Sequence, residues 1–250
     1  FGSDPFMFKI NYINGDQIET VSSPANVLGK CMHKCLEVYI NNLASGEGEA
    51  ILKAHAFGIE YLKNYPDGFI KYNKTIPSRA NLDERFAFTF FKYIKEYDLK
   101  KVKEIVLVEK MLKHKVEVDG RMLPIPLKGS ADFVYRDAEN RLVIDDHKIT
   151  GKFSAEEVID GAKLIQAAFN YFLVWAETGE RPYKMNFREF KYVENQDKSP
   201  QTREFEIVFD KHPLLFEFFY RYYFDVTNAL LGHQVFVPNV NAMYDKEVAI

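Results

Sequence analysis

The chain has 250 residues, of which 47% are hydrophobic and 15% aromatic, so it is long and apolar enough to bury a large core. A charged fraction of 28% excludes a largely disordered chain, and a formal net charge of -3 excludes a surface that is basic overall. Any contact with nucleic acid must therefore come from a local groove.

Cysteine use and hydropathy limit the cellular setting. The two cysteines, Cys31 and Cys35, are too few for a disulfide framework or a four-cysteine zinc or iron–sulfur site, so we expect reduced thiols and no iron–sulfur cluster. No stretch reaches the roughly 18 apolar residues of a membrane span, and no signal peptide is visible. We therefore predict a cytoplasmic protein without a membrane partner. Residues 1–6 look like an expression-vector remnant, which leaves residues 7–250 as a single domain.

The first hundred residues predict a hairpin followed by three helices. Asn14-Gly15 favours a tight turn between two short strand-like segments. Helices are expected over about residues 27–43, 50–63 and 81–96, because helix-ending or turn-forming residues flank each of these segments. In the third helix the spacing of four side chains predicts that they face a core: Phe86, Phe90, Phe91 and Ile94.

The second half of the chain alternates strand and helix patterns. Strand-like segments lie over residues 102–118, and Asp119-Gly120 predicts a hairpin turn after them. A capping-box pattern from Ser154 to Glu157 predicts a helix that runs to about residue 177. Two further strands and a last helix are expected over residues 185–193, 205–209 and 213–231. This order predicts one α/β domain with helical additions.

Residues 129–148 form the most informative stretch, because their pattern is that of a β-hairpin that carries charged side chains. The first arm alternates polar and apolar residues, and turn-forming residues separate it from the second arm. If Arg136 faces Leu142 across the turn, then Asp132 faces Asp146. The predicted hairpin therefore brings two carboxylates together.

Lys148 lies two residues beyond Asp146 and shares its face with Asp132, whereas Asp145 and His147 point to the opposite face. Two neighbouring carboxylates repel each other unless a cation lies between them, and a hard divalent ion such as Mg²⁺ prefers oxygen ligands. One interpretation is a metal site, in which Lys148 holds or helps to deprotonate a water, or stabilises charge that develops on a phosphorane. The other interpretation is a surface hairpin with solvated charges.

The motif Gly129-x-x-Asp132, followed by a strand that ends in Asp146-x-Lys148, resembles that of the PD-(D/E)XK nuclease superfamily, in its RecB-like exonuclease branch. The resemblance implies a restriction-endonuclease-like core, in which helices flank a mixed central β-sheet. The sequence lacks the cysteine cluster of the iron–sulfur members of this branch. By resemblance the catalytic residues are Asp132, Asp146 and Lys148. The implied ligands of one or two Mg²⁺ or Mn²⁺ ions are Asp132, Asp146, His33 and the backbone carbonyl of His147.

An upstream segment, Gly29-x-x-x-His33-x-x-Leu36-Glu37, resembles a helix that this branch carries. The resemblance implies that His33 is a further metal ligand that approaches from the helical side. Glu37 lies four residues on and shares the same helix face, so it is a candidate for a supporting carboxylate. His55 in the next predicted helix is the competing candidate for the role of His33.

Val108-Glu109 resembles a Val-Glu step that RecB-like nucleases often carry before the Gly-x-x-Asp motif. Two roles stay open for Glu109: a carboxylate that supports the metal site from outside, or a salt bridge at the edge of a strand.

The predicted helix after Lys148 carries, in this branch, a Gln-x-x-x-Tyr motif that contacts the nucleic-acid backbone. Gln166 matches the first position, but Asn170 stands where the tyrosine is expected, and Tyr171 follows it. Asn170 shares a helix face with Gln166, and Tyr171 lies away from that face. The candidate substrate contacts are therefore Gln166 and its partner Asn170, with Tyr171 beside them.

The resemblance implies a metal-dependent DNA exonuclease that hydrolyses phosphodiester bonds, acts on single strands or DNA ends, and works in recombination, repair or phage DNA processing. It would act alone or with a helicase or recombination partner protein. Two other functions stay open: a non-catalytic nucleic-acid-binding or assembly module of the same fold, and a metal-dependent nucleotide phosphohydrolase. The presence of Asp132, Asp146 and Lys148 argues against the non-catalytic module.

Overall fold

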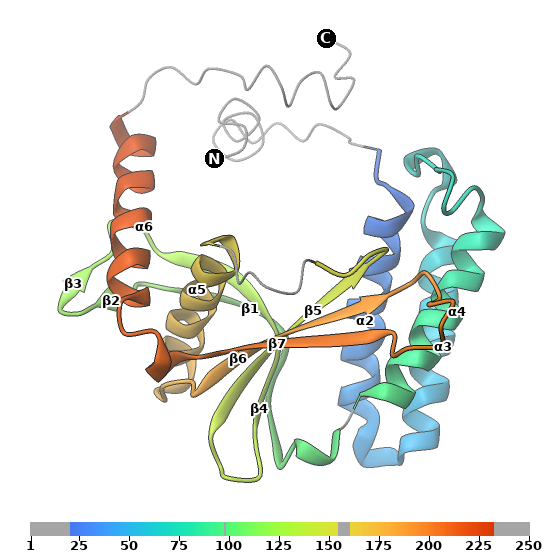
Figure 1. Cartoon of the computed structure of the whole chain (residues 1–250), viewed down its shortest axis with the longest axis horizontal. Helices are drawn as coiled ribbons and strands as arrows, with labels where there is room; N and C mark the ends of the chain where they lie inside the picture. Colours follow the sequence, from blue (N-terminus) through green and yellow to red (C-terminus); the bar gives the residue numbers. More distant parts are fainter. Residues whose placement is uncertain (1–20, 98, 155–160, 233–250) are drawn as a thin grey trace.

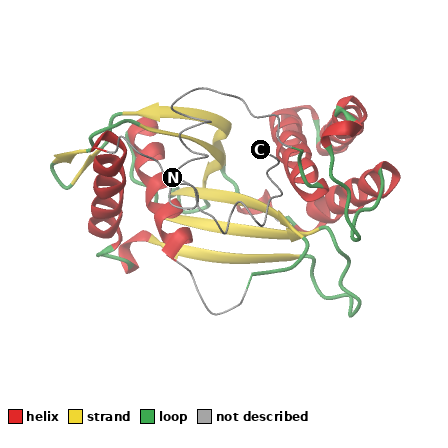
Figure 2. Ribbon diagram, turned by 90° about the horizontal axis from the view of Figure 1, so that it is seen from above, coloured by secondary structure: helices red, strands yellow, loops and turns green. Residues whose placement is uncertain are grey.

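The computed structural model describes residues 21–97, 99–154 and 161–232. The predicted N-terminal hairpin, residues 1–6 with the remnant expected there, and the first part of the helix expected after Ser154 lie outside the described residues. Within the described part, a sheet lies between two groups of helices (Figures 1 and 2). The expected α/β core, a mixed sheet flanked by helices, is confirmed.

The strands of the main sheet are β1 Glu104–His114, β4 Leu127–Arg136, β5 Leu142–Thr150, β6 Lys184–Lys191 and β7 Thr202–Val208. In the part of the chain that the structure describes, they form one five-stranded sheet of order β1-β4-β5-β6-β7. The strands β5 and β6 run parallel and the other neighbours run antiparallel. A parallel pair needs a crossover connection, and the helix α5 (Gly161–Thr178) lies in the connection between β5 and β6.

Helices pack on both faces of the sheet (Figure 2). On one face α2 (Pro24–Asn42) contacts β1 and β5, α4 (Arg79–Glu96) contacts β6, and α3 (Glu47–Asn64) packs against these two helices. On the other face α5 contacts β1 and β4, and α6 (Leu215–Gly232) packs against α5. The short elements are β2 Glu117–Val118, β3 Arg121–Met122 and the 3₁₀ turns Leu43–Ser45, Asp67–Phe69, Leu99–Lys101 and Phe209–Lys211.

The predicted helices are present, but α2, α3 and α4 begin a few residues earlier than the apolar pattern suggests. For α2 the reason is a cap: the Ser23 side chain accepts the backbone N–H of Asn26 at 3.2 Å, and Pro24 occupies the first turn. Ser78 caps α4 through the N–H of Asn81 in the same way. A capping side chain thus fixes the start of α2 and of α4, whereas Gly46 precedes α3 without a side-chain cap.

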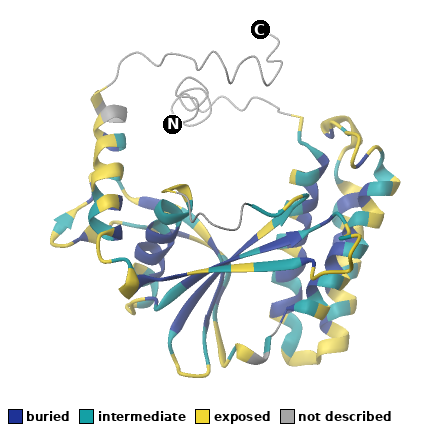
Figure 3. Cartoon of the chain, in the orientation of Figure 1, coloured by how far each residue is buried: buried dark blue, intermediate teal, exposed yellow. Residues whose placement is uncertain are grey.

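The described residues form two apolar cores, one on each face of the sheet (Figure 3). Phe86 and Phe90 of α4 are buried in the core under α2, as predicted, and Ile94 is partly buried against it. The prediction for Phe91 is wrong, because its side chain is 48% exposed. One residue after Phe90, the helix has turned by about 100°, so the two rings point in different directions.

The predicted hairpin turn at Asp119-Gly120 is confirmed and joins β2 to β3. Both residues have a positive φ, +48° for Asp119 and +77° for Gly120, as the tight turn of a two-residue hairpin requires. Among the described helices, none combines the length and the apolar character that a membrane crossing requires.

Candidate active site

The strands β4 and β5 form the hairpin that the sequence predicts. Arg136 pairs with Leu142, and the pairing continues to Phe133 and Asp145, where the ladder ends. The next residue on each strand is an aspartate, so the two carboxylates project at the point where the backbones separate.

Asp132 lies at this point on β4. Its Oδ2 accepts the backbone N–H of His147 at 2.9 Å, so a side chain replaces the backbone carbonyl that would accept this N–H in a regular ladder. The strand also changes face here. Ala131 packs in the core under α5, whereas Phe133 packs in the core under α2, although residues two apart on a regular strand share a face. The Asp132 carboxylate therefore lies where the strand turns over.

Glu109 lies opposite Asp132 on β1, in a gap between recorded backbone pairs. Its φ is +46°, a left-handed conformation that costs a residue with a side chain roughly 1–2 kcal/mol. In a regular strand Glu109 would share the face of Leu107, which packs in the core under α5. Its side chain instead reaches the helix on the other face, and such strain is concentrated at functional sites.

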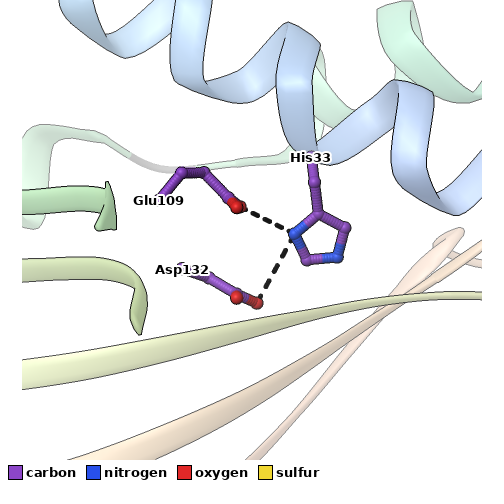
Figure 4. Close-up of side chains that lie close together, drawn as sticks. All are labelled: His33, Glu109 and Asp132. Carbon is purple, nitrogen blue, oxygen red and sulfur yellow. Dashed lines mark hydrogen bonds and ion pairs between the residues drawn. The ribbon is translucent and has the colours of Figure 1, made fainter. Parts of the chain in front are cut away.

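His33 of α2 meets both carboxylates (Figure 4). Its Nδ1 lies 2.7 Å from Oε1 of Glu109, in a hydrogen bond, and 3.6 Å from Oδ2 of Asp132. The candidate ligand atoms of these three residues all lie within 4.8 Å of one another. We call His33, Glu109 and Asp132 the acidic cluster.

Asp146 lies beside the acidic cluster but is not part of that three-residue group, and its partners are Gln166 of α5 and Lys148 of its own strand. Its Oδ1 accepts a hydrogen bond from Nε2 of Gln166 at 2.6 Å, and Nζ of Lys148 lies 3.2 Å from Oδ1 and 3.0 Å from Oδ2. The Oδ2 atom is buried and has no hydrogen bond of acceptable geometry to the described residues. Asp146 thus retains an unused acceptor.

The electrostatics of the site follow from burial. Burial raises the pKa of Asp132 to about 7; the positive charge of His33 opposes this shift, and the carboxylates of Asp146 and Glu109 add to it. Burial also raises the pKa of Asp146, against the effect of Lys148. Burial alone would lower the pKa of His33, but its hydrogen bond to Glu109 and the charge of Asp132 outweigh that effect and raise it. The carboxylates of the site therefore carry more negative charge than His33 and Lys148 neutralise.

Asp145 and His147 point to the opposite face, as the alternation of β5 predicts. Asp145 accepts hydrogen bonds from Arg188, Asn186 and Tyr97. The His147 ring is buried next to Tyr93, with Nε2 3.3 Å from the hydroxyl, and burial holds its pKa well below the usual range. The His147 side chain is thus structural, and its backbone is the part that faces the carboxylates.

His33 and His55 were competing candidates, and the structure brings His33 to the carboxylates. His55 of α3 instead lies among aromatic rings, with its centroid 5.6 Å from Phe86 and 4.8 Å from Phe91. Glu37 forms an ion pair with Lys34 of its own helix at 2.8 Å.

The other predicted substrate contacts are buried away from Gln166. The Asn170 side chain lies against the sulfur of Met185, and the Tyr171 ring packs against Phe209 and Phe216. Within the described structure only Gln166 of this trio touches an acidic residue of the site.

An open depression of about 650 Å³ leads to the acidic cluster. All three cluster residues line it, together with Lys148 and Gly29. Gly29 lines the depression one helical turn before His33, and a Cβ added there would meet nothing within 4 Å. At Gly129 an added Cβ would lie 2.6 Å from the Phe169 ring of α5, which explains why a glycine precedes Asp132 by three residues.

Sequence reasoning left the role of Glu109 open and did not foresee that it joins His33 and Asp132 directly. The Val108-Glu109 step was the one sequence feature that pointed to Glu109. The left-handed backbone of Glu109 could not be predicted, because it does not change the alternation of apolar residues along the strand. The partners of Asp145 were also missed, because they come from β6 and from Tyr97, the residue that follows α4.

Comparison with known proteins decides the family. The model of the PD-(D/E)XK nuclease superfamily matches residues 1–230. The chain belongs to the PD-(D/E)XK nuclease superfamily. No curated protein matches the sequence. Among solved structures, a predicted exonuclease from Eubacterium rectale has the same fold, with a TM-score of 0.53 and 15% sequence identity over 90% of this chain and 72% of that one. The crystal structure of SSO0001 has a TM-score of 0.35 and 14% identity, over 91% of this chain and 82% of that one.

Membership of the PD-(D/E)XK nucleases implies binding of nucleic acid and metal-dependent hydrolysis of phosphodiester bonds. The residues present fit a divalent cation. Two carboxylates and an imidazole converge within 4.8 Å, and Asp146 has a buried oxygen without a hydrogen bond. Oxygen-rich sets suit Mg²⁺ and Mn²⁺, and an imidazole is tolerated better by Mn²⁺ than by Mg²⁺.

Proposed function

We propose that this PD-(D/E)XK protein is a DNA exonuclease of the RecB-like branch that uses Mg²⁺ or Mn²⁺ and acts on single strands or DNA ends. The observation that carries the proposal is the acidic cluster with Asp146 and Lys148 beside it. The resemblance of the Gly29–Glu37 segment to the RecB-like helix supports assignment to the RecB-like branch, because that helix places His33 beside the carboxylates of the acidic cluster. Its biological setting would be recombination, repair or phage DNA processing, alone or with a helicase or recombination protein.

In this proposal His33, Glu109 and Asp132 hold the divalent cation, with Asp146 and the backbone carbonyl of His147 as further ligands. When bound, the cation would polarise the scissile phosphate and favour ionisation of the attacking water. Any proton that these side chains hold must leave before the cation binds, since metal ligands bind in their deprotonated form.

Lys148 has a separate role. Its ammonium lies within 3.2 Å of both oxygens of Asp146, and its side chain is half exposed on the wall of the depression. From there it can orient the attacking water or stabilise the negative charge that develops at phosphorus. Gln166 holds Asp146 in place through its amide, and its contact with the nucleic-acid backbone stays a prediction.

The test is cleavage of DNA labelled at one end. Linear single-stranded, linear double-stranded and covalently closed circular DNA are incubated with the protein in Mg²⁺, Mn²⁺ or EDTA. We expect short products from linear DNA in either metal, no products in EDTA, and an intact circle.

Three other outcomes would contradict all or part of this proposal. Cleavage of circles as fast as of linear DNA would refute the exonuclease assignment and leave a nuclease. Binding without cleavage in both metals would favour the non-catalytic module, and hydrolysis of nucleotides without cleavage of DNA would favour the phosphohydrolase.

A further inference from the structure

The depression that holds the acidic cluster extends beyond the residues that the proposed function uses. Its far wall is formed by α3, through Phe57 and Tyr61, and its near wall by α2, through Lys30 and Lys34. A second depression of about 380 Å³ continues along α3 and shares Phe57 and Tyr61 with the first. A groove therefore runs from the carboxylates along α3.

Aromatic rings follow this groove at intervals of one helical turn. Phe57, Tyr61 and Tyr65 are spaced four residues apart, and successive ring centroids lie 6.3 Å apart in both steps. Phe57 is 37% exposed, although a phenyl ring gains much from burial. The apolar side chains of Leu52 and Ile59 are also exposed on α3, but they line neither depression. The three rings are thus gathered on the side of α3 that faces the groove.

The charges along the groove are divided between its two walls. Lys30 and Lys34 line the wall of α2, and Lys34 shares its charge with Glu37 in an exposed pair that holds it only weakly. The second depression has the carboxylate of Glu60 and the amide of Asn64 but no cation among its lining residues. Phosphates therefore suit the α2 wall, and uncharged flat groups suit the α3 wall.

We propose that a single strand of nucleic acid lies in this groove next to the scissile phosphate, with unpaired bases stacked on Phe57 and Tyr61 and phosphates beside Lys30 and Lys34. A base stacks on a protein ring only when its face is free, which excludes a fully paired duplex from this segment. The ring spacing of 6.3 Å exceeds the roughly 3.4 Å rise of stacked nucleotides, so the bases are spread apart. The proposal rests on the proposed nuclease function and adds the form of substrate that the site takes.

The experiment measures binding and cleavage of a single-stranded oligonucleotide and of a blunt duplex of the same sequence, with full-length protein. Phe57→Ala and Tyr61→Ala should each weaken binding of the single strand by about 5- to 150-fold, the range typical of one base–aromatic stack. KM should rise by a similar factor and kcat should change less. Tyr61→Phe, which keeps the ring, should bind as the wild type does.

Two control variants separate stacking from general disturbance. Ile59→Ala removes a more exposed apolar side chain from the same helix, and Phe218→Ala removes an exposed ring from α6, which lies at the other end of the molecule (Figure 1). Both should bind the single strand as the wild type does.

A second measurement needs no variant of the protein. Oligonucleotides with an abasic site at successive positions should bind the wild type more weakly at one or two positions near the cleaved bond. At the position whose base stacks on Phe57, Phe57→Ala should cause no further loss, because the stacked base is already absent.

The outcomes distinguish the two proposals. If the wild type neither binds nor cleaves nucleic acid, the proposed function fails and this inference fails with it. If the wild type cleaves the single strand but abasic sites and the Phe57 and Tyr61 variants leave binding unchanged, the groove proposal alone is overturned.

Discussion

Asp145 and Asp146 are neighbours on β5 and both are buried, at 0% and 5% exposure, yet their surroundings differ completely. Asp145 has a guanidinium at 2.6 Å, from Arg188, and further donors from an amide and a tyrosine hydroxyl. Asp146 has one amide and a half-exposed ammonium, from Lys148, and keeps an oxygen without a hydrogen bond.

This difference is the one expected between a structural carboxylate and the functional one that we propose. A buried charge normally persists only when paired and fully hydrogen-bonded, and Asp145 meets that condition. Asp146 and Asp132 do not, and burial raises the pKa of both. The incomplete satisfaction of Asp132 on β4 and Asp146 on β5 therefore supports the proposal that a cation and a phosphate bind beside them.

The largest expected effect is on catalysis. Asp146→Asn keeps the shape of the side chain but removes the charge, so cleavage should fall by about 1000-fold or more, the scale of several kcal/mol lost from metal-assisted stabilisation. The melting temperature in EDTA should stay the same or rise, because a buried charge is removed. Single-turnover cleavage with a calorimetric scan checks both, and near-normal cleavage by the variant would contradict the role of Asp146.

On the opposite face the same logic predicts a loss of stability. Arg188→Ala leaves the charge of Asp145 buried without its cation, which should destabilise the fold by about 3–5 kcal/mol. Urea unfolding measures this, while kcat per folded molecule should change far less than in Asp146→Asn. The double variant Asp145→Asn with Arg188→Met should recover much of the stability. If Arg188→Ala unfolds at the wild-type urea concentration, the contrast between the two aspartates is wrong.

The pH dependence of stability in EDTA tests the acidic cluster. The pKa of Asp132 is raised from 3.8 to about 7, so the folded protein holds a proton that the unfolded chain has released, and folding is penalised increasingly as pH rises towards 7. The raised pKa of Asp146 acts in the same direction, and so does that of His33, whose stabilising contribution is lost as pH rises through its folded value. Burial lowers the pKa of His147, which opposes this trend below about pH 6.5, because the unfolded chain then binds a proton that the folded protein does not. The melting temperature should therefore fall between about pH 6.5 and about pH 8.

The same melting experiment is repeated with Mn²⁺ in place of EDTA. Mn²⁺ should raise the melting temperature more at the upper end of the pH range than at the lower end, because its ligands must be deprotonated. A melting temperature in EDTA that rises with pH over this range would refute the electrostatic description of the cluster.

The smallest effects come from two glycines that differ in the space around them. At Gly58 of α3 an added Cβ would lie 2.0 Å from the Phe86 ring and 2.6 Å from the Cys35 sulfur, so Gly58→Ala should destabilise by about 1–3 kcal/mol. At Gly29 nothing lies within 4 Å, so Gly29→Ala should stabilise α2 by about 0.5–1 kcal/mol. Urea midpoints of the two variants should move in opposite directions, and shifts of the same sign would show that the space at one of them is misjudged.

Much of the fold could be predicted from local patterns. The helices follow from the 3.6-residue spacing of apolar side chains and from the residues that flank them, and the register of the Asp132–Asp146 hairpin follows from the alternation of its arms. Phe91 was misassigned because the apolar stripe of α4 is narrower than its sequence suggests.

The candidate site could be predicted only where its residues are close in sequence. Asp146 and Lys148 lie two apart on one strand, so their ion pair is a local property. The choice between His33 and His55 was open, because each lies on a helix and only the packing of α2 over β1 brings one of them to the carboxylates.

Local sequence patterns are enough to establish the α/β order of elements, the hairpin with its two aspartates and lysine, and the family to which they belong. Contacts between distant elements establish that Glu109 turns against the alternation of β1 to meet His33. They also establish that Asp145 is paired with Arg188 and fully hydrogen-bonded, whereas the cation of Asp146 is the half-exposed Lys148. The tertiary structure also decided that Phe57 and Tyr61 stand beside the acidic cluster. The physical reason is range: alternation and helical periodicity are local, whereas burial, charge pairing and the walls of a groove depend on contacts between elements far apart in the chain.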